Sequence, residues 1–170
     1  GDASAGDAAF VAEFCLAHDI PHLSRGLDIA AEAARRRVSI QDAARQARYA
    51  FLESAADVLG ASLIATAHTR DDQAETVLLN VLRGTGIDGL RGIPEKRGRI
   101  IRPLLGVPRA EIERYCAEHG LIPRQDASNA DPSHYLRNRV RLELLPLLDQ
   151  AYHPGVRGSL LRLSRLAAQD

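Results

Sequence analysis

The feature that most constrains the fold is a short, nearly unbroken apolar run, Ser-Leu-Ile-Ala-Thr-Ala at residues 62–67, which lies between two stretches with helical periodicity. In the stretch before it, Ser39 is a good N-cap and apolar positions recur at helical spacing as far as Val58. The stretch after it is helical over roughly residues 71–83. A short apolar run in this setting is typical of a strand in a parallel sheet that helices cover on both faces. We therefore expect an α/β fold in which residues 62–67 form a central strand.

Other patterns predict further elements on both sides of this strand. We expect helices over about residues 5–18, 108–119, 135–148 and 158–168, and short strands within residues 20–29 and 99–104. Pro146 should bend or end the third of these helices, because proline has no amide hydrogen to donate. Residues 126–132 are rich in turn-forming residues. The chain thus divides into an α/β part over residues 1–130 and a helical part over residues 131–170.

Composition and charge exclude several classes of protein. Of the 170 residues, 45% are hydrophobic and 26% are charged, which is ordinary for a globular domain. No apolar run approaches the ~18 residues that cross a bilayer, so we expect no membrane partner. The formal net charge is +0, but residues 133–165 contain six arginines and only two acidic residues. Cys15 and Cys116 lie far apart and outside any metal-ligand spacing, as reduced thiols of a cytosolic protein do.

Acidic residues directly after the apolar run form the first candidate site. Ligands of open α/β sheets bind beyond the carboxyl ends of the strands, which is where His68 lies. Asp72 and Glu75 are three residues apart and share one face of the following helix. Two interpretations stand at this point. The acids cap the helix and complement its dipole, or they line a pocket for a cation, either nucleotide-bound Mg²⁺ or an ammonium group.

A pair of arginines and a glycine turn are weaker candidates. Arg45 and Arg48 share one face of the helix that begins at Ser39, and such a face is either solvated or contacts an anion. Gly84 and Gly86 flank a turn that either brings the backbone close to a phosphate or simply ends a helix.

A basic helix near the C-terminus is the last candidate. Arg137, Arg139 and Arg141 lie within five residues of one another, and the first and third of them share a helix face. Such a cluster fits a phosphate or polyanion as well as it fits an ordinary solvated surface.

Taken in order, these segments resemble the bacterial tRNA(Ile)-lysidine synthetases, which are members of the N-type ATP pyrophosphatases. The segments that carry the resemblance are AARQARYAFL (43–52), IATAHTRDDQAETVLLNVLRGTGIDGL (64–90), IIRPLL (100–105), DASNAD (126–131) and RNRVRLELLPLL (137–148). They cover nearly the whole chain, and the second and the last are specific in combination. The resemblance implies a Rossmann-like fold of the adenine nucleotide alpha hydrolase type, with a parallel sheet, flanking helices and a helical C-terminal part.

The resemblance also implies an activity, that of a ligase forming a C–N bond. ATP, with Mg²⁺, activates C2 of the wobble cytidine of tRNA(Ile) with a CAU anticodon, and L-lysine then attacks that carbon. The implied compartment is the cytoplasm, and the oligomeric state is left open. The implied site residues are Asp72, Glu75, Arg45 and Arg137 for catalysis, His68, Arg48, Gly84 and Gly86 for the nucleotide, and Asn138, Arg139 and Arg141 for tRNA, with no residue assigned to a metal.

One departure from the family pattern limits what we expect of this polypeptide. Family members begin with a strand and a Ser-Gly-Gly-x-Asp-Ser loop that grips pyrophosphate through backbone amides, and no such sequence occurs here. We therefore expect the first strand, loop and helix, and further C-terminal domains, to be missing, and the activity to belong to a longer parent protein. The alternatives are a non-catalytic tRNA-binding fragment and a tRNA thiolase of the same superfamily. Thiolases usually use cysteines, and the isolated Cys15 and Cys116 count against that alternative.

Overall fold

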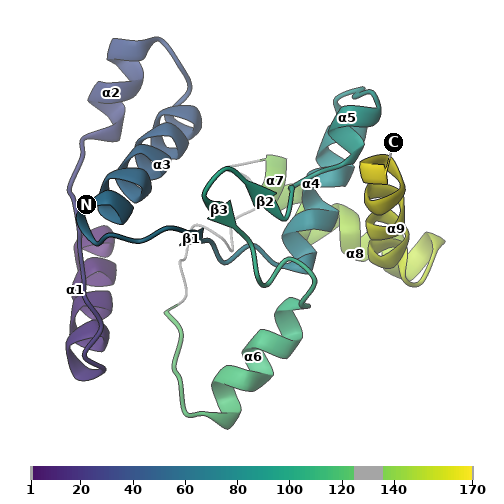
Figure 1. The fold of residues 1–170 in the computed structure, drawn as a ribbon. Coiled ribbons are helices and arrows are strands. Elements are labelled where there is room, and N and C mark those ends of the chain that lie inside the picture. Colours follow the sequence, from purple (N-terminus) through teal and green to yellow (C-terminus); the bar gives the residue numbers. More distant parts are fainter. Residues whose placement is uncertain (1, 125–135, 170) are drawn as a thin grey trace. The chain divides into compact units, whose positions relative to one another are not determined.

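The computed structural model describes residues 2–124 and 136–169, which form two compact units, one ending at Ile64 and the other beginning at Ala65. The first unit contains α1 (Asp2–Ala17), α2 (Ile29–Arg36) and α3 (Ile40–Val58), and β1 (Ile64–Ala65) spans the junction between the units in the sequence (Figure 1). The second contains α4 (Arg70–Leu82), α5 (Ile87–Leu90), β2 (Lys96–Arg97), β3 (Ile100–Ile101), α6 (Arg109–Glu118), α7 (Leu136–Arg139), η2 (Val140–Leu144), α8 (Leu145–Leu147), η3 (Leu148–Tyr152) and α9 (Val156–Gln169). The turn-rich residues 126–132 and the expected boundary at residue 130 lie outside the described residues.

In the first unit, two helices begin with side-chain caps. The Ser39 side chain accepts a hydrogen bond from the Asp42 amide and starts α3, as its sequence predicts. Asp28 does the same for α2, which lies beside α3 (Figure 1). The strand expected within residues 20–29 is wrong, since residues 20–28 have no regular structure and a helix follows. Asp28 ahead of an alanine-rich segment is an N-cap signal, and it outweighs the scattered apolar residues before it.

The sheet of the described chain is mixed and has the strand order β1-β3-β2. The Thr66 amide donates to the Ile101 carbonyl at 3.0 Å, and β2 pairs antiparallel with β3, with Arg97 opposite Ile100. The expected α/β class is confirmed, but the expected central strand is wrong, because β1 is two residues long and lies at one end of this order. Gly98, with φ +60°, turns β2 directly back into β3. The hairpin makes this part of the sheet antiparallel, whereas the apolar pattern of the sequence predicted a parallel sheet.

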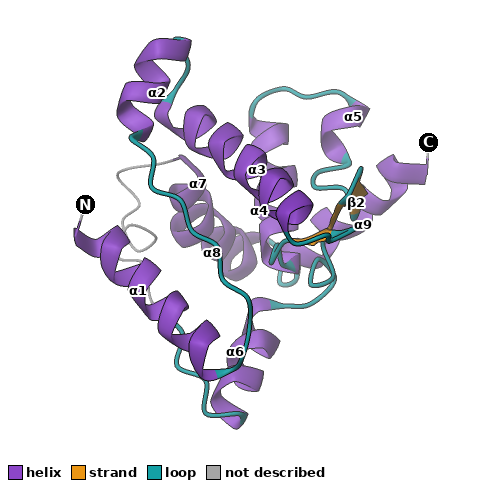
Figure 2. Cartoon of the chain, turned by 60° about the vertical axis from the view of Figure 1, so that its left-hand side comes forward, coloured by secondary structure: helices purple, strands orange, loops and turns teal. Residues whose placement is uncertain are grey.

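Most of the described chain is helical, and the core of the second unit forms around α4 (Figure 2). Leu78 and Leu79 of α4 pack with Val140 and Leu145, which come from the helical run after residue 135. α4 also lies against α5 and α9. No helix within the described ranges is long and apolar enough to cross a membrane. This packing holds the first turn of α4 against the basic helix that contains Arg137 and Arg141. It thereby positions the candidate site described below.

The helical run over residues 136–152 continues through Pro146, so the proline does not end it, although an end was one of the two outcomes expected. The turns on either side of Pro146, η2 and η3, are π-helical. The Leu145 amide donates to the Val140 carbonyl and the His153 amide to the Leu148 carbonyl, each five residues back. Wide turns of this kind accommodate a residue that cannot donate in the ordinary four-residue pattern.

Leu145→Ala is expected to lower the free energy of unfolding by about 2–5 kcal/mol, because Leu145 is fully buried in this core and its truncation leaves a cavity. Leu147→Ala, two residues away and 51% exposed, is the matched control and should change stability by less than about 0.5 kcal/mol. Urea denaturation of the two variants measures the difference. Equal losses would contradict the packing described here.

Candidate functional site

The first turn of α4 begins with a reciprocal pair of hydrogen bonds between Thr69 and Asp72. The Thr69 amide and hydroxyl each donate to Asp72 Oδ2 at 2.8 Å, and the Asp72 amide donates to Thr69 Oγ1 at 3.4 Å. This is a capping box in which an aspartate takes the place of the usual glutamate. The capping interpretation of Asp72 is therefore confirmed. It uses only one of the two carboxylate oxygens, so it does not exclude a role for the other.

The other carboxylate oxygen of Asp72, Oδ1, belongs to a cluster with Glu75, Arg137 and Arg141, which we call the acid–arginine cluster. Arg137 Nη2 lies 2.7 Å from Asp72 Oδ1, and Arg137 Nε donates to Glu75 Oε2 at 2.8 Å. Arg141 Nε donates to Glu75 Oε1 at 2.6 Å and its Nη2 donates to Glu75 Oε2 at 3.0 Å. The sequence correctly predicts that Asp72 and Glu75 share a helix face, and the structure adds that two of the predicted site arginines face them.

Burial differs sharply among the members of this cluster. The Glu75 side chain is only 1% exposed and Arg141 is 22% exposed, whereas Arg137 is 40% exposed. The hydrogen bond to Glu75 raises the pKa of Arg141, and the negative charges of Glu75 and Asp72 add to this effect while burial opposes it. A buried carboxylate is tolerated only when charge and hydrogen bonds compensate its lost hydration. Arg141 is thus the buried partner of Glu75, and Arg137 is the partner that borders solvent.

Asp71, next to this cluster, joins the ends of several helices. Its Oδ2 accepts a hydrogen bond from the Arg109 amide at 2.8 Å, at the start of α6. Its Oδ1 lies 3.1 Å from Nη1 of Arg157 on α9, and Arg157 Nε lies 3.1 Å from Asp149 Oδ2. Sequence reasoning missed Arg157 and Asp149, because contacts this distant in sequence leave no periodic signal. The Thr69–Asp72 spacing of a capping box was visible in the sequence.

The predicted nucleotide residues of the second unit lie at the two ends of α4. His68 Nδ1 lies 3.0 Å from Thr66 Oγ1, just before the helix. Gly84, with φ +74°, follows the C-cap of α4, and Gly86 is the N-cap residue of α5. The glycine turn therefore has the geometry of a helix stop. Contact of these residues with a nucleotide stays a prediction.

The remaining predicted residues fall into two groups. Arg45 and Arg48 lie on α3 in the first unit, where the Arg45 guanidinium stacks 5.0 Å from the centroid of the Tyr49 ring. Asn138 is 6% exposed, whereas the Arg139 side chain is 62% exposed and lies 3.7 Å from Glu143. Arg139 is thus the member of the basic helix most open to an external partner.

The described residues contain no group of three or more histidine, cysteine, aspartate or glutamate side chains that could hold a metal ion. The four carboxylate oxygens of Asp72 and Glu75 already accept from Thr69, Arg137 and Arg141. A divalent ion at these oxygens would have to displace two guanidinium groups.

Comparison with known proteins places these residues in a family. Residues 2–148 match the family model described as the PP-loop domain. Proteins named tRNA(Ile)-lysidine synthase are similar over nearly the whole length of the chain. The one from Deinococcus deserti is 47% identical over 98% of this chain and 31% of its own length. The one from Clostridium acetobutylicum is 38% identical over 100% of this chain and 37% of its own.

The chain therefore spans about a third of the length of the curated relatives it matches. Among solved structures, the U34-tRNA thiolase NcsA from Methanococcus maripaludis is similar with a TM-score of 0.62 and 21% identity, over 96% of this chain and 57% of that one. At that identity, the likeness concerns the fold alone. The family match covers most of the chain, including α4 and the basic helix with their acid–arginine cluster, and on this ground the chain belongs to the PP-loop domain family.

Proposed function

We propose that the protein containing this chain joins lysine to C2 of the wobble cytidine of tRNA(Ile) with a CAU anticodon. In the first step, ATP activates the C2 oxygen as an adenylate and pyrophosphate leaves. In the second, the ε-amine of lysine attacks C2, AMP leaves, and the amine loses a proton. The observation that carries this proposal is the 38–47% identity, over nearly the whole chain, to proteins named tRNA(Ile)-lysidine synthase.

In this proposal, Asp72 and Glu75 bind the ε-ammonium group of lysine and accept its proton. A carboxylate within hydrogen-bonding distance of an amine performs both tasks. Both acids are occupied by arginines in the free chain, and Arg137 is the more exposed of the two partners. Arg137 therefore yields its place to the substrate ammonium group and turns its own charge toward phosphate. Arg141 remains on Glu75 and holds it in place.

The other predicted site residues keep the roles that the family resemblance implies. His68, Arg48, Gly84 and Gly86 contact the nucleotide, and Arg45 contacts the activated base or a phosphate. Asn138 orients the basic helix and Arg139 faces the tRNA backbone. Mg²⁺ enters as the counterion of ATP, without a ligand from the acid–arginine cluster, and the compartment is the cytoplasm.

The test is the modification of tRNA by the purified protein that contains this chain. Incubation with ATP, lysine and a tRNA(Ile) transcript with a CAU anticodon should yield lysidine, detected by mass spectrometry of the digested nucleosides. Formation should require both ATP and lysine. A gel shift without turnover would instead indicate a non-catalytic tRNA-binding protein, and incorporation of sulfur would indicate a thiolase.

Glu75→Gln is expected to raise the KM for lysine about tenfold or more, because the amide retains the shape of the side chain but loses the charge that attracts an ammonium group. Initial rates at varied lysine concentration measure the change. Glu113→Gln, on α6 and 63% exposed, is the control and should leave this KM unchanged. An unaltered KM in Glu75→Gln would remove Glu75 from the lysine site.

A further inference from the structure

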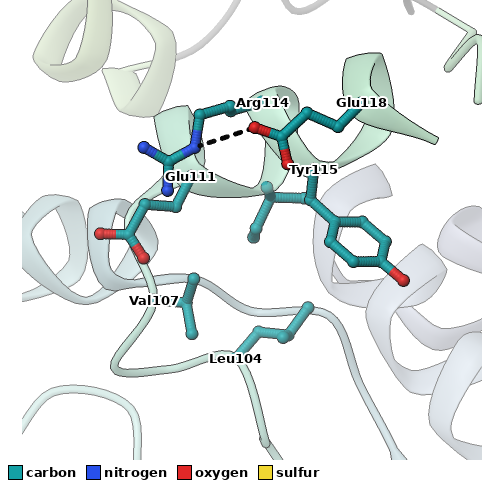
Figure 3. Close-up of a pocket in the computed structure, with 7 residues that line it drawn as sticks. Leu104, Val107, Glu111, Arg114, Tyr115 and Glu118 are labelled. Carbon is teal, nitrogen blue, oxygen red and sulfur yellow. Dashed lines mark ion pairs between the residues drawn. The ribbon is translucent and has the colours of Figure 1, made fainter. Parts of the chain in front are cut away.

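Two cavities among the described residues of the second unit have similar size but different chemistry. The cavity under α6 has a volume of about 460 Å³, and Leu104, Val107 and Tyr115 are among the residues that line it (Figure 3). Its charged lining residues are two glutamates and Arg114, which lies 3.7 Å from one of them, Glu118. This cavity does not attract anions. The other cavity, which we call the α4–α9 pocket, has a volume of about 420 Å³ and a different charge.

Buried polar side chains of α4 and α9 help to line the α4–α9 pocket. Gln73 is 6% exposed and Ser164 is 3% exposed. Gln73 Nε2 donates to the Arg91 carbonyl at 3.0 Å and to Ser164 Oγ at 3.4 Å, while its Oε1 accepts from the Ile93 amide. These bonds tie α4, α9 and the segment after α5 to one another. Gln73 and Ser164 therefore form a rigid wall of the pocket, and their hydrogen bonds are made to other groups of the protein.

The charged residues around this wall are mainly cationic. Arg70, Arg91 and Arg165 line the pocket together with one acid, Glu95. Arg91 is held in place because its Nε donates to the Ala167 carbonyl at 3.0 Å. Arg91 Nη2 also lies 3.5 Å from Oδ1 of Asp88, which does not line the pocket. Among the residues that the structure describes, Arg70 and Arg165 form no ion pair. These two arginines outnumber the single acid of the lining, so the pocket is net positive.

The α4–α9 pocket lies on the opposite side of α4 from the acid–arginine cluster. Successive residues of an α-helix turn by ~100°, so residues 70 and 73 project ~160° away from the mean direction of residues 72 and 75. Arg70 and Gln73 line the pocket, and Asp72 and Glu75 contact the basic helix. A ligand in the pocket is therefore separated from the proposed lysine site by the width of a helix.

We infer that the α4–α9 pocket binds a phosphate group of the tRNA backbone, away from the nucleotide that reacts. This inference rests on the proposed function for the identity of the RNA. Guanidinium groups present forked donors that match phosphate oxygens, and three of them border one hollow. A contact of this kind positions the RNA without reading its sequence.

The test is the salt dependence of tRNA binding by the protein that contains this chain. Filter binding of a tRNA(Ile) transcript is measured at several salt concentrations for the wild type, Arg70→Ala and Arg165→Ala. Each variant should bind several-fold more weakly, and the slope of log affinity against log salt should fall by about 0.7–0.9 for each lost phosphate contact. The KM values for lysine and ATP should not change.

Arg162→Ala is the matched control. Arg162 lies on α9, as Arg165 does, but it donates to Ser159 Oγ and does not line the pocket. Variants of Arg70 and Arg165 whose slopes equal that of Arg162→Ala would overturn the inference. A second measurement follows thermal stability in inorganic phosphate at constant ionic strength. The inference would also be overturned if phosphate raised the melting temperature of the wild type but not of Arg165→Ala, while both bound tRNA equally well. That result would assign the pocket to free phosphate. Binding is measured without turnover, so a failure to form lysidine would count against the proposed function alone.

Discussion

Asp72→Ala is expected to lower the rate of lysidine formation by about 10²–10⁴-fold, the usual loss when a positioned acid or base is removed. Asp72 Oδ1 contacts only guanidinium groups in the free chain, so it is the oxygen that can receive the ammonium group of lysine. The rate is measured with saturating ATP and tRNA, over a range of lysine concentrations. Activity near the wild-type level would leave Asp72 with a capping role only.

The capping box separates the two roles of Asp72 experimentally. The interaction of Asp72 with the helix dipole alone gives its loss a cost of about 0.3–1 kcal/mol. The cap that the structure shows raises the expected cost of Asp72→Ala to about 1–2 kcal/mol. Asp72→Asn retains an oxygen that can accept from the Thr69 amide but has no charge. Its melting temperature should stay close to that of the wild type while its activity falls as in Asp72→Ala.

Arg141→Ala should be the most destabilising of the charge substitutions. It leaves Glu75 buried with Arg137 alone, so we expect a loss of about 2–3 kcal/mol, below the ~3–5 kcal/mol of a fully broken buried pair. Arg139→Ala, two residues away and 62% exposed, should change stability by less than about 0.5 kcal/mol. Urea denaturation of the 170-residue chain measures both.

A double variant tests the cause of that loss. If the penalty comes from the uncompensated charge of Glu75, adding Glu75→Gln to Arg141→Ala should restore about half of the lost stability, because the amide is neutral. A double variant less stable than Arg141→Ala would show that Glu75 is not the source of the penalty.

The helices follow from local signals, and their bounds were largely predictable for this reason. Ser39 and the alanine stripe define α3, and Pro108 and Gly120 flank α6 as the sequence predicts. The errors occur where a single residue decides the geometry. Asp28 starts a helix in a segment expected to be a strand, and Gly98 turns the chain into an antiparallel hairpin.

The two acids and the two arginines of the acid–arginine cluster were each predictable as a pair on one helix, but the contact between the pairs was not. Helical spacing places Asp72 with Glu75 and Arg137 with Arg141, because each pair lies on one element. Their mutual contact joins residues more than sixty positions apart, and it depends on the packing of α4 against η2. Spacing along a single helix contains no information about that packing, and an arginine aimed at an internal acid has the same local pattern as one aimed at phosphate.

The wide turns around Pro146 determine which changes of length this segment tolerates in evolution. Each π-turn holds about one residue more than an α-helical turn would need, which is the trace that a single-codon insertion leaves in a helix. Deleting one residue within 140–144 would restore the narrower turn and leave Leu145 directed at the core that it fills. The same deletion in a regular α-helical turn, such as the middle of α4, would rotate the residues that follow by ~100°. Homologous genes should therefore tolerate the loss of one codon between the RNRVR motif and Pro146 better than the loss of one codon within α4.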